Sequence, residues 1–281
     1  MNSRIGPNVL SIDEPGEIVE RMARFLKTHA ERIGAKCLVV GLSGGLDSSV
    51  AAALCSTAVG GSHTIGVWIQ EEESFNQSSL RDALDVAKKF GIRIKKLDMT
   101  PLTHSIASIV QPDRERLVPW GNVKARLRAM ILYYFANSNN GLVVGTGDKS
   151  EIMLGYFTKY GDGACDLQPL ADLYKTSLRE VARYLKLPNR ISSKPSSPEL
   201  WPGQTAEREL GLPYEKLDLI LWGLERWMAP EDISEELSIP LSNVKEIRTR
   251  WILSEHKRRP PLAMKLGFRT AGQDLRIPYN A

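Results

Sequence analysis

The sequence has few cysteines and no long apolar segment, and both shortages limit what the protein can be. Its 281 residues include only Cys37, Cys55 and Cys165, which stand far apart and lack the spacing of metal ligands. We therefore expect reduced thiols, with neither a disulfide framework nor a zinc site. Nowhere do 18 apolar residues follow one another, and the N-terminus lacks the apolar run of a secretory signal. These features predict a cytoplasmic protein without a membrane segment.

The sequence also lacks a large excess of either positive or negative charge. Lys and Arg together number 37 and Asp and Glu 33, so the formal net charge is only +4. Because the two signs are well mixed, this excess does not predict binding to nucleic acid, although a local basic site for an anionic substrate is compatible with it. The apolar fraction of 42% is sufficient for a buried core in a chain of this length. The composition is that of a globular protein.

Short apolar runs alternate with helical patterns up to about residue 146. We expect strands at 37–42, 64–69, 92–98 and 141–146, and helices at 18–34, 48–59, 77–90 and 122–137. Strands that alternate with helices form parallel sheets covered on both faces. The pattern therefore predicts an α/β fold, with a Rossmann-like parallel sheet sandwiched by helices.

The remaining segments complete the predicted organisation. Ser11 and Glu14 have the form of a capping box before the first helix. Residues 187–213 contain five prolines and no clear periodicity, so they are either disordered or a lid over a site. We predict one domain over 1–281, made of an N-terminal helix in 1–35, an α/β core in 36–186, a lid-like loop in 187–213 and a helical part in 214–281, where helices are expected at 214–228, 230–237 and 243–259.

The most informative segment is VGLSGGLDSS, which runs from Val40 to Ser49 between the first strand and the next helix. Its glycines allow positive φ and a close approach of backbone N–H groups to a phosphate, and Ser43, Ser48 and the helix N-terminus add further donors. The carboxylate of Asp47 would repel phosphate unless a divalent cation lay between them, so we assign Asp47 to Mg²⁺. A plain glycine-rich turn is the alternative, and SGGxDS directly after an apolar strand disfavours it.

This loop resembles that of the ATP pyrophosphatase, or PP-loop, superfamily, whose members split ATP into AMP and pyrophosphate while adenylating a substrate. It lacks the GxxxxGK[ST] pattern of kinases and GTPases. Further segments resemble the ammonia-dependent branch of the NAD synthetase family: NVKAR (122–126), GTGDKSE (145–151), FTKYGDG (157–163), DLQPL (166–170) and EHKR (255–258). The resemblance implies an adenine nucleotide alpha hydrolase-like fold and an ATP-dependent ligase. Such a ligase amidates nicotinic acid adenine dinucleotide (deamido-NAD) with ammonia through an adenylated carboxylate, and it releases NAD, AMP and pyrophosphate.

The resemblance also implies a set of site residues. ATP would contact Gly41, Leu42, Ser43, Gly44, Gly45, Leu46, Asp47, Ser48, Thr146, Lys175 and Ser196; deamido-NAD would contact Arg126, Lys159, Asp166, His256 and Lys257; Mg²⁺ would be held by Asp47 and Glu151. Lys175 would offset the charge that develops on the departing pyrophosphate, and no residue is expected to act as a nucleophile. Taken singly, these lysines, arginines and carboxylates would be ordinary solvated side chains.

Position alone supports two of these residues, and one residue departs from the family. Thr146 and Glu151 follow a buried strand, so they would lie at the carboxyl end of the sheet, where ligands of open α/β proteins bind. Trp68 stands where many relatives have an arginine near the nucleotide. How the adenine of ATP is held is therefore left open.

The nitrogen source and the rival functions follow from the rest of the chain. About 35 residues precede the first strand, which is too few for the glutaminase domain that glutamine-dependent relatives carry. We therefore expect ammonia as the nitrogen donor. The resemblance also implies a homodimer, and the mixed charge already argued against a nucleic-acid partner. One alternative is another adenylating ligase of the superfamily, such as a tRNA thiolase or a GMP synthetase-like enzyme. A second is DNA binding by residues 230–251, which have the form of a helix-turn-helix.

Overall fold

The computed structural model describes residues 5–113 and 115–275. Within these ranges four parallel strands form one sheet in the order β3-β2-β1-β4, with bounds Cys37–Gly41 (β1), Thr64–Gln70 (β2), Arg93–Asp98 (β3) and Gly141–Val144 (β4). Strand β1 is central because Leu38, Val39 and Val40 are apolar on both faces, and all three are fully buried. The prediction of a parallel sheet is confirmed.

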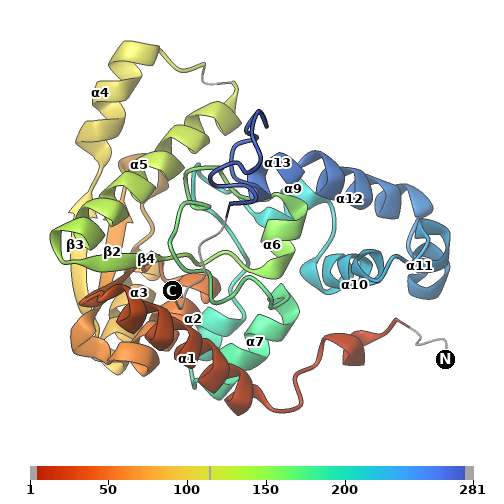
Figure 1. Cartoon of the computed structure of the whole chain (residues 1–281), viewed down its shortest axis with the longest axis horizontal. Helices are drawn as coiled ribbons and strands as arrows, with labels where there is room; N and C mark the ends of the chain where they lie inside the picture. The colour runs from red at the N-terminus through yellow and green to blue at the C-terminus, as the bar shows by residue number, and fades with distance from the viewer. Residues whose placement is uncertain (1–4, 114, 276–281) are drawn as a thin grey trace.

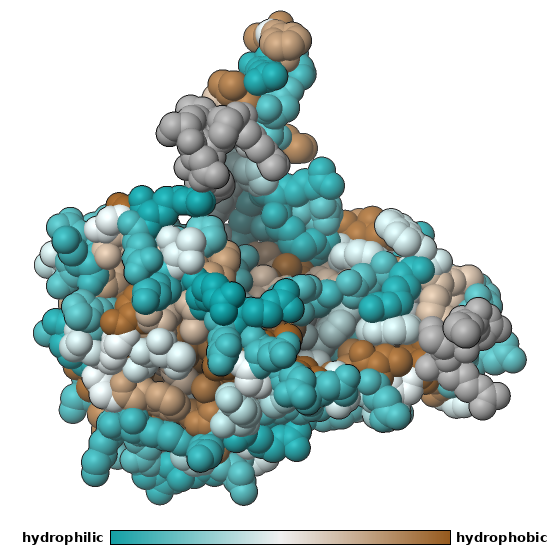
Figure 2. Space-filling model, turned by 60° about the horizontal axis from the view of Figure 1, so that its bottom comes forward, coloured by the Kyte–Doolittle hydropathy of each residue, from teal (hydrophilic) through white to brown (hydrophobic). Residues whose placement is uncertain are grey.

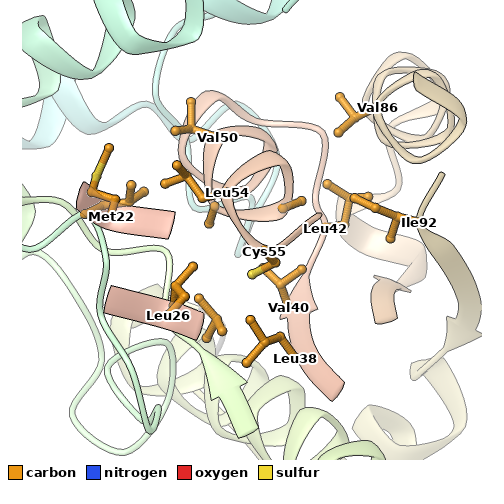
Figure 3. Packing of buried hydrophobic residues seen from close by; sticks show 14 of the residues in the cluster. Met22, Leu26, Leu38, Val40, Leu42, Val50, Leu54, Cys55, Val86 and Ile92 are labelled. Atoms are coloured by element: carbon orange, nitrogen blue, oxygen red, sulfur yellow. The ribbon is translucent and has the colours of Figure 1, made fainter. Parts of the chain in front are cut away.

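Helices cover both faces of this sheet (Figure 1). One face carries α1 (Pro15–Ile33), α2 (Leu46–Val59), α3 (Gln77–Lys89) and α7 (Lys175–Tyr184), and the other carries α5 (Leu117–Ser138). Side chains of a strand alternate between faces, so Leu38 and Val40 pack with Leu54 of α2, whereas Val39 packs with Ala136 of α5. Figure 3 shows Cys55 pointing towards Val40 of β1.

The C-terminal helices form a second core beside the sheet layer. These helices are α10 (Tyr214–Glu225), α11 (Pro230–Leu237), α12 (Leu241–Leu253) and α13 (Glu255–Arg258). Tyr214, Leu217 and Leu221 of α10 are buried against Ile233 of α11 and Val244 of α12. The pair α11–α12 that resembled a helix-turn-helix therefore uses its apolar side to cover α10 (Figure 1).

Shorter elements connect these layers. They are η1 (Pro7–Leu10), η2 (Gly61–His63), η3 (Glu72–Ser74), α4 (Thr100–Val110), α6 (Lys149–Leu154), α8 (Asn189–Ser192) and α9 (Ala206–Leu210). Residues 187–213 thus include two short helices within an otherwise irregular segment. The predicted division of the chain into parts stays a prediction, and residues 1–4 and 276–281 at its ends lie outside the described residues.

Three local predictions differ from the structure. The capping box is wrong, because α1 begins at Pro15, no side-chain cap bond is formed, and Ser11 ends η1. A proline suits the first helical turn without a cap, since its missing N–H would have no partner there. Helix α4 was not expected, and α5 begins five residues before Asn122. The end of α1 follows expectation: Gly34 takes the left-handed conformation that terminates a helix.

The face of the molecule in Figure 2 is mainly hydrophilic, and the three cysteines form no disulfide bond with one another. Figure 2 shows a face on which hydrophilic residues predominate and apolar ones form scattered patches. Among the helices described, none combines the length and the apolar character needed to cross a bilayer. Cys37, Cys55 and Cys165 are free thiols.

Candidate active site

A cavity of about 650 Å³ lies at the carboxyl end of the sheet. Gly41 and Ser43 at the end of β1, Gln70 at the end of β2 and Thr146 after β4 contribute to its wall. The strand order reverses between β1 and β4, so the connections that follow them run in opposite directions and leave a crevice. A cavity of this size is in the range of small-molecule sites.

The loop between β1 and α2 has the geometry of an anion cradle. Gly44 has φ +82°, and a Cβ there would lie 2.2 Å from the carbonyl oxygen of Ser79, so glycine alone fits. The Ser43 and Ser48 hydroxyls lie 3.0 Å apart, and Asp47 belongs to the first turn of α2. The loop therefore offers backbone donors, two hydroxyls and the positive end of a helix to an anion. The side chains of Leu42 and Leu46 are buried in the core, so these residues present only backbone.

Three carboxylates gather beside this loop. Asp47, Asp148 and Glu151 each offer one oxygen, and these oxygens all lie within 4.8 Å of one another. Asp47 and Glu151 line the cavity with about one fifth of each side chain exposed, whereas Asp148 is fully buried. Sequence reasoning selected Asp47 and Glu151 and missed Asp148. The available signal was its position before α6, where Asp148 accepts a hydrogen bond of 2.8 Å from the Glu151 N–H as an N-cap residue.

The ammonium of Lys175 lies among these carboxylates. Its Nζ is 2.5 Å from Asp47 Oδ1, 3.0 Å from Asp148 Oδ2 and 2.9 Å from Glu151 Oε1, and the side chain is fully buried. Burial lowers the pKa of Lys175, but the three carboxylates outweigh burial and raise it well above its usual value. Lys175 therefore stays charged. Lys175 is not among the residues that line the cavity, whereas its partners Asp47 and Glu151 are.

Burial and mutual repulsion disfavour the ionised form of these carboxylates. Burial raises the pKa of Asp148 to about 7, although the Lys175 ammonium opposes the shift, and burial also raises the pKa of Glu151 well above its usual value. When all three are ionised, one ammonium leaves two negative charges unbalanced. A divalent cation would remove that imbalance.

The donor set fits Mg²⁺ in two respects. Carboxylate oxygens are the ligands that this ion prefers, and two of the three carboxylates face the cavity. The buried Asp148 Oδ2 lies 3.0 Å from the Lys175 ammonium, which already stabilises its negative charge. The residues present therefore fit a divalent cation.

The residues predicted to bind deamido-NAD do not all line the cavity. Of the five, Lys257 lines the cavity, and its ammonium donates to the carbonyls of Gly155 and Phe157. Arg126 donates to the Lys159 carbonyl at 3.2 Å, and Lys159 donates to the His256 carbonyl at 2.6 Å, so these three lie together on a surface outside the cavity wall.

Asp166 has a contact that sequence reasoning did not anticipate. One of its oxygens accepts a 2.7 Å hydrogen bond from the Val143 N–H, and the other accepts one from the Tyr133 hydroxyl. Asp166 therefore fixes the segment after FTKYGDG to strand β4 in this structure, and it does not line the cavity.

Residues 187–213 contribute a wall of the cavity. Ser196, Glu199 and Trp201 line it, together with Trp68 from β2. Arg128 of α5 also lines it and donates to the carbonyls of Pro198 and Glu199 at 3.3 and 3.1 Å. Arg128 was missed because nothing in its local sequence shows that an arginine of α5 will meet a segment 70 residues away. Residues of this segment thus line the site, and its role as a lid stays a prediction.

Comparison with known proteins decides among the ATP-using families. The model of the NAD synthase family matches residues 18–261. The chain belongs to the NAD synthase family. A relative named NH(3)-dependent NAD(+) synthetase, from Hyperthermus butylicus, is 40% identical over 258 residues, which are 91% of this chain and 92% of the relative. A protein of the same name from Methanocaldococcus jannaschii is 43% identical over 247 residues, 87% of this chain and 95% of its own length.

Solved structures of this NAD synthase family share the fold. NMN synthetase from Francisella tularensis superposes with a TM-score of 0.79 at 30% identity and covers 90% of this chain and 99% of its own. The NH3-dependent NAD synthetase of Campylobacter jejuni, solved with nitrate, has a TM-score of 0.75 at 27% identity and covers 91% of this chain and 100% of its own. The predicted fold class and family are confirmed, and neither the other adenylating ligases nor the DNA-binding reading is favoured.

Proposed function

We propose that this member of the NAD synthase family makes NAD by ATP-dependent amidation of deamido-NAD with ammonia. Curated relatives that align over most of the chain are named for that activity. The observation that carries the proposal is that one cavity is lined both by Ser43 and Ser48 of the anion cradle and by Asp47 and Glu151 of the carboxylate cluster. A triphosphate and its cation need these two features side by side.

The chemistry has two steps. A carboxylate oxygen is a poor leaving group, so the nicotinate carboxylate first attacks the α-phosphorus of ATP, forming an acyl adenylate as pyrophosphate departs. Ammonia then attacks the acyl carbon, and AMP leaves with the bonding electron pair while the nitrogen loses a proton. Both steps need alignment and neutralisation of charge rather than a protein nucleophile.

The residues present can supply that alignment and neutralisation. The N–H groups and hydroxyls of the cradle would bind phosphate oxygens, and Thr146 and Ser196, which both line the cavity, would contact the nucleotide. Asp47 and Glu151 would hold Mg²⁺, with Asp148 behind them; this ion would supply positive charge to the departing pyrophosphate. Lys175 would supply a second positive charge at the same place.

The dinucleotide would extend beyond the cavity. Lys257 borders the cavity, and Arg126, Lys159 and His256 form a neighbouring surface, so the nicotinate end would lie inside and the rest of deamido-NAD along that surface. We propose a homodimer in which a second copy covers this surface, and we expect the enzyme to act in the cytoplasm.

A product assay tests the proposal. Purified protein is supplied with deamido-NAD, ATP, Mg²⁺ and ammonium, and NAD and AMP are measured; both should appear in equal amounts. Formation of ADP in place of AMP would contradict the adenylation chemistry. A second arm replaces ammonium with glutamine, which should support little turnover.

A third arm replaces deamido-NAD with nicotinic acid mononucleotide, because one solved relative is named NMN synthetase. The dinucleotide should be the better substrate by kcat/KM. A preference for the mononucleotide would overturn the proposed substrate while leaving the reaction type intact.

A further inference from the structure

Lys175 and a divalent cation would compete for the same three carboxylates. The ammonium lies between 2.5 and 3.0 Å from an oxygen of Asp47, Asp148 and Glu151, and these residues offer oxygens within 4.8 Å of one another. Both cations would therefore be centred in nearly the same small volume. Two positive centres so close together repel each other strongly, because little water separates them.

The three carboxylates differ in how firmly they are held. Asp148 is fully buried and fixed by its hydrogen bond from the Glu151 N–H. Asp47 and Glu151 reach the cavity and are each about one fifth exposed. A ligand that enters from the cavity therefore meets Asp47 and Glu151 first, while Asp148 stays in contact with Lys175.

The attachment of Lys175 allows its ammonium to move. Its backbone is fixed at the start of α7, where its N–H donates to the Ser150 hydroxyl at 2.9 Å. The charge stands at the end of a flexible four-carbon stem, so it can change partners without a change in the fold.

We propose that Lys175 is the resident counter-ion of the carboxylate cluster, and that it gives up Asp47 and Glu151 when the metal binds. Building on the proposed function, the triphosphate of ATP supplies the replacement partner for the displaced ammonium. The metal then enters together with the nucleotide and is not held beforehand. Lys175 thus makes metal binding depend on nucleotide, a positioning role that adds to its expected contact with ATP phosphates.

Metal binding without nucleotide tests this exchange. Mn²⁺ is titrated into the full-length protein, and free Mn²⁺ is followed by electron paramagnetic resonance. The wild type should bind Mn²⁺ weakly, and Lys175→Met should bind it at least about tenfold more tightly because the competing charge is gone. Lys257→Met is the matched control, since it removes a cation from the same cavity without touching the three carboxylates. Its affinity should stay close to that of the wild type.

Melting temperatures show whether the variants are folded and give a second measure of metal binding. Lys175→Met should melt below the wild type and recover when Mg²⁺ is added without nucleotide, whereas the melting temperature of the wild type should need both Mg²⁺ and ATP to rise. If Lys175→Met does not fold, the double variant Asp148→Asn/Lys175→Met removes one charge of each sign and should show the same gain in Mn²⁺ affinity.

Three results would overturn the exchange: tight Mn²⁺ binding by the nucleotide-free wild type, no gain in either Lys175 variant, or an equal gain in Lys257→Met. None of these measurements uses deamido-NAD or turnover. A failure here is therefore distinguishable from a failure of the proposed function.

Discussion

Two buried lysines lie among carboxylates in this protein, and only one of the two clusters faces the cavity. Lys124 of α5 is 2.8 Å from Glu71 and 2.6 Å from Glu73, which follow strand β2. Lys124 is fully buried and Glu71 almost so, and none of these three residues lines the cavity. Lys175, equally buried, has three carboxylates, of which two border the cavity.

The difference separates a structural ion pair from a binding site. Around Lys124 two carboxylates share the ammonium, and Glu73 is partly exposed to solvent. That cluster ties the turn after β2 to α5, and none of its three residues lines the cavity. Around Lys175 three carboxylates share one ammonium next to open space, so an incoming cation gains free energy there. The two lysines are equally buried; the number of carboxylates and access to the cavity differ.

The largest effect on stability is expected at the structural pair. Lys124→Met leaves Glu71 buried without its partner, so the free energy of unfolding should fall by about 3–5 kcal/mol. Denaturant unfolding measures the change. Because this cluster is closed to the cavity, added Mg²⁺ should not restore stability, in contrast to Lys175→Met. If Mg²⁺ restored the free energy of unfolding of Lys124→Met, the two clusters would be equivalent and the distinction between them would be wrong.

At the cavity the same kind of change should affect the reaction rather than the fold. Asp47→Asn should lower the rate of NAD formation by roughly 10²–10³-fold, the usual effect of losing one charge-stabilising group. The free energy of unfolding should not fall, since one of the repelling carboxylates is neutralised. Product assays and denaturant unfolding on the same preparation check both parts. A large loss of stability with unchanged turnover would assign Asp47 to the fold.

The smallest effect is expected at Glu73. Glu73→Gln leaves Lys124 paired with Glu71 in a balanced pair, and the side chain is partly exposed, so the free energy of unfolding should change by less than about 1 kcal/mol. NAD formation should be unchanged. The matched variant Glu151→Gln, which removes the same charge from the other cluster, should lose most of its turnover. Equal activity in the two variants would contradict the distinction.

Prediction from sequence succeeded where the signal is local. The apolar runs predicted the four strands of the described sheet, and SGGLDSS lies between a strand and a helix as its spacing predicted. Prediction failed where local signals compete: Ser11 and Glu14 matched a cap, but Pro15 began the helix instead. The roles of the predicted site residues remain predictions, although the structure brings Asp47, Glu151 and Lys175 together.

What the sequence by itself determined is the alternation of strands and helices, the glycine-rich loop and the family, because these depend on residues close together in the chain. Only the tertiary structure decided which charges meet. Lys175 and Asp47 are 128 residues apart, and Arg128 reaches Pro198 across 70. Asp148 became part of the carboxylate cluster for the same reason. A charged side chain has the same local pattern whether it is solvated or buried, and its pKa and its partners are set by whichever elements pack against it.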